Sequence, residues 1–113
     1  MNANKVNALV VEDNLHMLRI ITAIVKGIGI NNVRATQDPV LGLEIFKTNP
    51  IDLVFLDREM PVLDGIEFTK LIRTDKTSPN QFVPIIMITA YTEKSSIIEA
   101  RDAGVTEICG KPI

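Results

Sequence analysis

The strongest constraint on the fold is a regular alternation of two kinds of segment along the chain. Short runs rich in apolar residues occupy positions 6–11, 32–36, 52–56, 83–88 and 105–109. Runs of this length, bounded by polar residues and turn signals, are typical of buried strands. The segments between them, at 15–28, 39–49, 66–73 and 93–103, carry the apolar spacing or the end signals of helices. Strict strand–helix alternation predicts an α/β fold with a doubly wound parallel sheet and helices on both faces.

Local signals refine the predicted helices. The buried face of the first one is marked by apolar residues at helical spacing, namely Leu15, Leu18, Ile21, Val25 and Ile28. Asp38 before Pro39 predicts the start of the second helix, because Asp is a favoured N-cap residue and Pro a favoured first residue.

Length and charge narrow the class of protein. A chain of 113 residues is the size of one domain, so residues 1–113 are expected to form a single unit. The net charge of −2 favours neither a nucleic-acid surface nor an anionic membrane surface. The single cysteine, Cys109, excludes a disulfide within the chain and fits a reducing compartment. With no signal peptide or membrane span recognisable, the sequence predicts a cytoplasmic protein.

Chemically versatile side chains follow the predicted strands at the point where each one ends. They are Glu12 and Asp13 after the first strand, Asp57 after the third, Thr89 after the fourth and Lys111 after the fifth. The carboxyl ends of parallel strands share one edge of the sheet, where ligands bind. We therefore expect three carboxylates, a hydroxyl and an ammonium to converge there.

This set of groups favours a particular chemistry. Clustered carboxylates repel one another unless a cation lies among them, and a site made only of oxygen ligands suits Mg²⁺. Lys111 offers a point charge to a phosphate, and Thr89 offers a hydrogen bond. A carboxylate among them, such as Asp57, can act as a nucleophile and form an aspartyl phosphate.

These motifs resemble the signature of response-regulator receiver domains. The matching stretches are Glu12-Asp13, Asp57-Arg58-Glu59-Met60-Pro61 followed by Asp64-Gly65, Thr89-Ala90, Ala103-Gly104-Val105 and Lys111-Pro112. The resemblance covers the whole chain in order. It implies a flavodoxin-like strand order of 2-1-3-4-5 and a phosphoryl-accepting switch of a two-component phosphorelay, which is not a conventional enzyme. It also implies a histidine kinase or histidine phosphotransfer protein as donor, a downstream protein target and a possible phosphorylation-dependent dimer.

The resemblance further implies roles for individual residues. Asp57 would accept the phosphoryl group. Mg²⁺ would be held by Glu12, Asp13, Asp57 and the backbone carbonyl of Glu59. Thr89 and Lys111 would bind the phosphoryl group and relay its presence, and Lys111 would be followed by a cis peptide bond.

The chain departs from the family pattern at two points. Ile108 stands where the family usually has an aromatic residue that moves with the threonine. The family also has a fifth helix after the last strand, so residues 1–113 are expected to end before that helix. Two residues beside the site, Glu59 and Tyr91, are expected to modulate how long the phosphoryl group survives.

A second function stays open from the sequence. Phosphatases that use an aspartate nucleophile with Mg²⁺ also place that residue at a strand end and want a carboxylate two residues later. Glu59 has this offset from Asp57, but the chain has no capping domain. A dinucleotide-binding fold is disfavoured because no G-x-G-x-x-G follows the first predicted strand.

Overall fold

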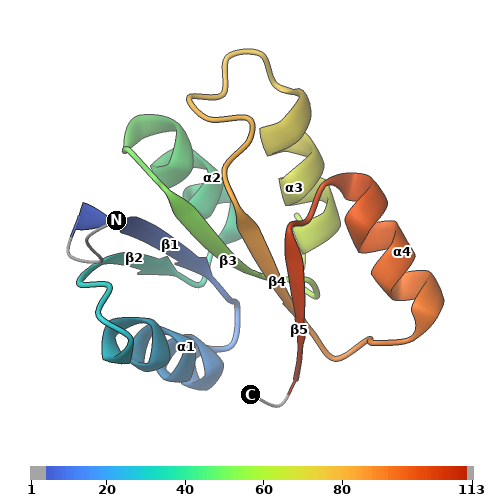
Figure 1. Ribbon diagram of the computed structural model, residues 1–113, viewed down its shortest axis with the longest axis horizontal. Helices are drawn as coiled ribbons and strands as arrows, with labels where there is room; N and C mark the ends of the chain where they lie inside the picture. Colours follow the sequence, from blue (N-terminus) through green and yellow to red (C-terminus); the bar gives the residue numbers. More distant parts are fainter. Residues whose placement is uncertain (1–4, 112–113) are drawn as a thin grey trace.

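The strands form one parallel sheet in the computed structural model, which describes residues 5–111 (Figure 1). They are β1 (Asn7–Val11), β2 (Asn32–Thr36), β3 (Leu53–Asp57), β4 (Ile85–Thr89) and β5 (Glu107–Gly110). Their order in the sheet is β2-β1-β3-β4-β5, which confirms the predicted order. The helices that alternate with them are α1 (Leu15–Gly27), α2 (Pro39–Thr48), α3 (Gly65–Thr74) and α4 (Lys94–Ala103).

The last two strands begin two residues later than the apolar runs predict. Pro84 has no amide hydrogen to contribute to the ladder, and β4 starts at Ile85. Val105 donates its amide hydrogen to the Ala100 carbonyl at the end of α4, so it closes the helix instead of joining β5. Gly104 makes this closure possible because its φ of 108° is costly for residues with a side chain.

The predicted buried face of α1 is correct in its middle and wrong at its two ends. Leu18, Ile21 and Val25 are buried, whereas Leu15 is 43% exposed and Ile28 is 66% exposed. Leu15 opens the helix at the carboxyl edge of the sheet. Ile28 is the C-cap residue, where the chain leaves the helix and the helical period no longer determines direction. The predicted start of α2 is confirmed, since Asp38 accepts a 2.9 Å hydrogen bond from the Val40 amide.

Two apolar layers cover the sheet, one on each face. Helices α2, α3 and α4 pack on one face through large side chains that include Phe46, Phe68 and Ile72. Helix α1 packs on the other face through Leu18, Ile21 and Val25 (Figure 1). Within residues 5–111, none of these helices is long and apolar enough to cross a membrane.

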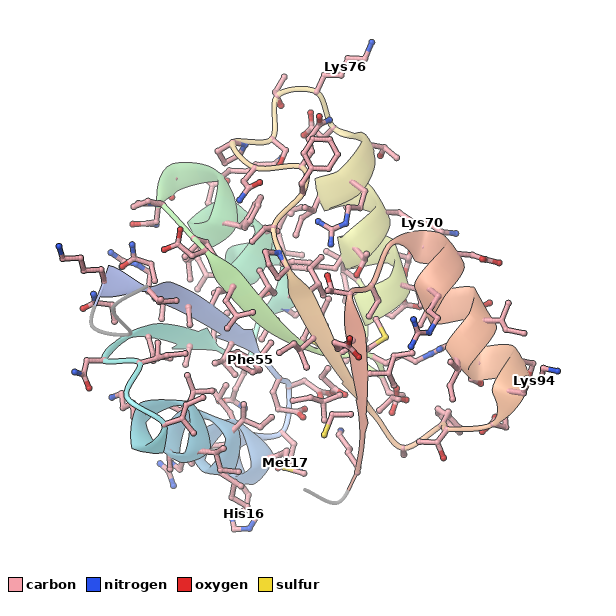
Figure 2. All side chains as sticks on the ribbon, viewed as in Figure 1. His16, Met17, Phe55, Lys70, Lys76 and Lys94 are labelled. Carbon is pink, nitrogen blue, oxygen red and sulfur yellow. The ribbon has the colours of Figure 1, made fainter. Side chains whose placement is uncertain are left out.

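The α1 face of the sheet carries an open apolar groove of about 160 Å³. It is lined by Ile21, Ile24, Val25, Phe55, Ile86, Ile88 and Cys109. Phe55 projects from β3 on the side of α1 (Figure 2). Cys109 is a free, half-buried thiol that packs against this layer.

Candidate functional site

Polar side chains from four strands meet at the carboxyl edge of the sheet. Glu12 and Asp13 follow β1, Asp57 ends β3, Thr89 ends β4, and Lys111 follows β5. Because β1, β3 and β4 are neighbours in the sheet, the ends of these strands lie side by side. The convergence predicted from the sequence is therefore observed.

The three carboxylates form one compact cluster. Glu12, Asp13 and Asp57 each have a carboxylate oxygen within 4.8 Å of the others. Glu12 is fully buried, and Asp57 is 1% exposed. Buried charge of one sign is costly unless a cation or a proton neutralises it.

The two buried carboxylates are each satisfied on one oxygen and orphaned on the other. The Asn14 amide donates to Oε2 of Glu12 at 3.2 Å, and the Glu59 amide donates to Oδ1 of Asp57 at 3.3 Å. Oε1 of Glu12 and Oδ2 of Asp57 are buried and receive no hydrogen bond. Buried polar atoms are rarely left in this state, so the two oxygens fit a hard divalent cation.

Lys111 is the cation that approaches this cluster. Its Nζ lies 3.0 Å from Oδ1 of Asp57 and 3.3 Å from Oε1 of Glu12. The backbone fixes its position, because the Lys111 amide donates to the Thr89 carbonyl at 2.7 Å. Its side chain is 23% exposed, which leaves part of the ammonium open to the crevice.

These surroundings move two pKa values upward. Burial and the neighbouring Glu12 carboxylate raise the pKa of Asp57 to about 8, and the contact with Lys111 offsets only part of this rise. Burial by itself lowers the pKa of Lys111. The hydrogen bond to Asp57 and the charges of Asp57 and Glu12 outweigh burial, so the Lys111 pKa lies above its usual value.

Thr89 is engaged by a partner that the sequence did not predict. Its hydroxyl donates to Oε2 of Glu59 at 2.9 Å and accepts a hydrogen bond from the Tyr91 amide at 2.9 Å. The second oxygen of Glu59 accepts from the Ala90 amide at 3.1 Å. Glu59 therefore connects the end of β3 to the loop that follows β4.

The loop after Asp57 is fixed by two further residues that sequence reasoning did not single out for the site. A Cβ atom on Gly65 would lie 2.5 Å from the backbone carbonyl oxygen of Asp57, so only glycine lets α3 begin so close to the end of β3. Arg58 bridges this loop to α4 by donating to the Ser96 carbonyl at 2.9 Å and by pairing with Glu99. The Asp64-Gly65 pair was visible in the sequence as part of the family signature, whereas nothing local marks the contact between Arg58 and α4.

The remaining residues of interest lie around this crevice. Tyr91 is 52% exposed at its rim. Ile108 is half-buried and packs on the layer formed by α2, α3 and α4. His16 is exposed and points away from the sheet, in keeping with a surface role (Figure 2). The predicted cis bond before Pro112 lies outside the described residues.

Comparisons with other sequences point in one direction. A family model described as the response regulator receiver domain matches residues 8–113. The chemotaxis protein CheY-3 of Vibrio cholerae is 36% identical over 104 residues, which cover 92% of this chain and 78% of that protein. The chemotaxis protein CheY of Pseudomonas aeruginosa is 31% identical over 104 residues, covering 92% of this chain and 82% of that protein.

Comparisons with solved structures agree. The chemotaxis response regulator CheY4 of Vibrio cholerae superposes with a TM-score of 0.86 at 26% identity, covering 96% of this chain and 88% of the other. The receiver domain of a Pseudomonas aeruginosa sensor histidine kinase superposes with a TM-score of 0.81 at 29% identity, covering 95% and 85%. That second structure contains a magnesium ion coordinated in its active-site cleft.

Proposed function

The chain belongs to the response regulator receiver domain family and is a phosphoacceptor signalling switch, and we propose that Asp57 is the residue that accepts the phosphoryl group. The observation that carries this proposal is the orphaned Oδ2 of Asp57, a buried carboxylate oxygen with no hydrogen-bond donor. It lies at the end of β3, in a cluster of acids that one lysine approaches. We propose that residues 1–113 act as one receiver domain.

In this proposal Asp57 takes the phosphoryl group directly from the donor. A carboxylate oxygen of Asp57 attacks the phosphorus of a phosphohistidine, the phosphorus–nitrogen bond breaks, and the imidazole of the donor leaves with its electron pair. Lys111 then pairs with an oxygen of the phosphoryl group, and Thr89 donates a hydrogen bond to another. The donor is a histidine kinase or a histidine phosphotransfer protein in this proposal.

Glu12, Asp13 and Asp57 would hold Mg²⁺, with the backbone carbonyl of Glu59 as a further ligand. The fit is supported by Oε1 of Glu12 and Oδ2 of Asp57, two buried carboxylate oxygens that receive no hydrogen bond. Oε1 of Glu12 has the Lys111 ammonium 3.3 Å away as an ion-pair partner. When bound, the ion neutralises negative charge on the carboxylates and on the incoming phosphoryl oxygens. A divalent charge beside Asp57 also favours its ionised form, which is the form that can attack phosphorus.

The phosphatase alternative requires a carboxylate two residues after the nucleophile that is free to exchange protons with a substrate. Glu59 has the offset, but both of its carboxylate oxygens are occupied by Thr89 and Ala90. This occupation favours the switch. Multiple turnover of small phosphate esters would instead support the enzyme.

The lifetime of the phosphoryl group is part of the proposal. Water must attack the phosphorus from the side opposite Asp57, past Glu59 and Tyr91. Glu59 adds negative charge there, and Tyr91 adds bulk, so we propose slow self-dephosphorylation. Faster phosphate loss in Glu59→Asn and in Tyr91→Ala would support these roles, and slower loss in either variant would reverse the role of that residue.

Partners and location complete the proposal. The switch would pass its state to a downstream protein in the cytoplasm, a compartment that keeps a free thiol such as Cys109 reduced. A phosphorylation-dependent dimer is also proposed, supported by the open apolar groove on the α1 face. Sedimentation velocity with and without beryllofluoride tests the dimer.

The phosphorylation site can be tested directly. We expect incubation with acetyl phosphate and Mg²⁺ to add one phosphoryl group, which mass spectrometry locates on Asp57. Asp13→Asn should abolish this labelling while the circular dichroism spectrum stays unchanged. The matched control is Asp52→Asn, because Asp52 is an exposed acid at the opposite end of β3 whose side chain, among the described contacts, accepts a hydrogen bond only from the Asn7 amide. Labelling of a residue other than Asp57, or normal labelling of Asp13→Asn, would contradict the assignment.

A further inference from the structure

The side chain of Glu59 uses both of its oxygens to hold the segment that follows β4. Oε2 accepts from the Thr89 hydroxyl at 2.9 Å, and Oε1 accepts from the Ala90 amide at 3.1 Å. The Glu59 amide meanwhile donates to Asp57 at 3.3 Å. One residue is therefore bonded both to the proposed acceptor and to the proposed sensor of the phosphoryl group.

The Thr89 hydroxyl has no hydrogen left to donate to a phosphoryl group. A hydroxyl has one hydrogen to donate, and here that hydrogen is directed to Glu59. The hydroxyl oxygen already accepts from the Tyr91 amide at 2.9 Å. Phosphoryl oxygens are acceptors only, so Thr89 cannot donate to one of them and to Glu59 at the same time.

Charge repulsion would also favour the release of Thr89 from Glu59. A phosphoryl group on Asp57 would place negative oxygens near the Glu59 carboxylate, since the two residues are joined by a hydrogen bond through the Glu59 amide. Like charges at such short range repel, and screening is weak in a half-buried crevice. Phosphorylation would therefore weaken the very contacts that hold Thr89 and Ala90.

We propose that Glu59 is a latch that competes with the phosphoryl group for Thr89 and thereby sets the resting state of the switch. The proposal rests on the proposed function of Asp57 and concerns the regulation of that same site. Release of the latch frees the segment between β4 and α4. Helix α4 itself stays tied to the loop after β3 through the contacts of Arg58 with Ser96 and Glu99.

The test compares Glu59→Ala and Glu59→Gln with the parent and with Glu99→Gln. Glu99 lines the same cavity as Glu59 and carries the same charge, but it pairs with Arg58 and not with Thr89. Beryllofluoride with excess Mg²⁺ serves as the phosphoryl mimic, and amide NMR reports both its affinity and the hydrogen exchange of Ala90.

The latch predicts two coupled changes in Glu59→Ala. The Ala90 amide should exchange about tenfold faster in the protein without beryllofluoride, as expected for loss of a hydrogen bond to a charged group. The affinity for beryllofluoride should rise about tenfold, because Thr89 no longer has to be released. Glu59→Gln should fall between Glu59→Ala and the parent, since its remaining carbonyl oxygen can keep one of the two bonds. Glu99→Gln should match the parent in both measurements.

Other results would refute either the latch alone or the proposed function of the site. If Glu59→Ala and Glu59→Gln gain the same affinity while Ala90 exchange is unchanged, charge repulsion alone explains the effect and the latch is refuted. Faster Ala90 exchange without a gain in affinity also refutes it, because the contact then exists without competing. If the parent itself fails to bind beryllofluoride, the proposed function of the site is wrong and the latch falls with it.

Discussion

Asp57 makes the stability of the metal-free protein depend on pH in an unusual direction. Its pKa is raised to about 8 in the folded protein from an ordinary value of 3.8. The folded state therefore binds more protons than the unfolded state between about pH 4 and about pH 8. The free energy of unfolding must fall as the pH rises through this window, and the loss is complete above about pH 8.

The size of this effect follows from the linkage relation. One proton bound in the folded state but not in the unfolded state changes the free energy of unfolding by about 1.4 kcal/mol per pH unit. Between pH 5 and pH 7 the parent should lose about 2–3 kcal/mol through this residue. Asp57→Asn removes the titration, keeps an oxygen that can accept from Lys111, and offers an amide hydrogen to the orphaned Oε1 of Glu12. The variant should therefore be more stable than the parent at pH 7 and close to it at pH 4.

Urea unfolding followed by circular dichroism in EDTA measures this difference at pH 4, 5, 6 and 7. Asp52→Asn is the control, because Asp52 is exposed and lies outside the acidic cluster, so this substitution should leave the pH profile of the parent unchanged. Adding Mg²⁺ should stabilise the parent most at pH 7, since the cation binds the ionised cluster and not the unfolded chain. Parallel pH profiles for the parent and Asp57→Asn would refute the reasoning, because they would mean that Asp57 is not the residue that titrates.

Three other substitutions test separate features, each by urea unfolding in EDTA. Lys111→Met leaves the buried carboxylates without their cation and should cost about 3 kcal/mol, part of which Mg²⁺ should restore. Val62→Asn should raise the free energy of unfolding by about 1 kcal/mol, because Val62 has a φ of 70° and is 90% exposed. Val40→Asn, on the exposed surface of α2, is the control and should not raise it. Gly65→Ala should cost about 1–3 kcal/mol and impair phosphorylation, since its Cβ would lie 2.5 Å from a backbone oxygen at the end of β3. Gly27→Ala, which meets nothing within 4 Å, is the neutral control, and equal effects in the two glycine variants would contradict the packing argument.

The fold and the set of residues that gather at the site were predictable, because both follow from short-range sequence patterns and from the parallel pairing of the strands. The sequence itself contains the apolar runs of the strands and the apolar spacing of the helices. The alternation of strands and helices then favours parallel pairing in the sheet. Parallel pairing alone brings the ends of β1, β3 and β4 to one edge, so Glu12, Asp57 and Thr89 could be expected to meet without any knowledge of their contacts. Errors are confined to element ends, where a cap such as the bond from Val105 to Ala100 competes with the ladder.

The partners of the site residues were not predictable in the same way. Glu59 and Thr89 are 30 residues apart, and Arg58 and Glu99 are 41 residues apart. Their meeting depends on how far one loop reaches toward another, which no periodicity encodes. The Glu59 side chain was expected to modulate the lifetime of the phosphoryl group, and its contact with Thr89 was not expected.

The charges of the site explain why it contains buried carboxylate oxygens without a hydrogen bond, which an ordinary protein core rarely contains. When all are ionised, the three carboxylates of the cluster and the one ammonium of Lys111 leave two negative charges in excess. Lys111 cannot remove this excess, and a proton on Asp57 removes only part of it, which agrees with the raised pKa of that residue. A divalent cation held by Glu12, Asp13 and Asp57 would match the excess, and its charge would favour the ionised form of Asp57, which is the form that the proposed function needs. Phosphorylation of Asp57, as proposed, would replace one carboxylate charge with the larger charge of a phosphoryl group, which Lys111 and the cation would neutralise and the Glu59 carboxylate would repel. The raised pKa of Asp57 and the proposed release of Thr89 by Glu59 would thus share one cause, the excess of acidic over basic side chains at one edge of the sheet.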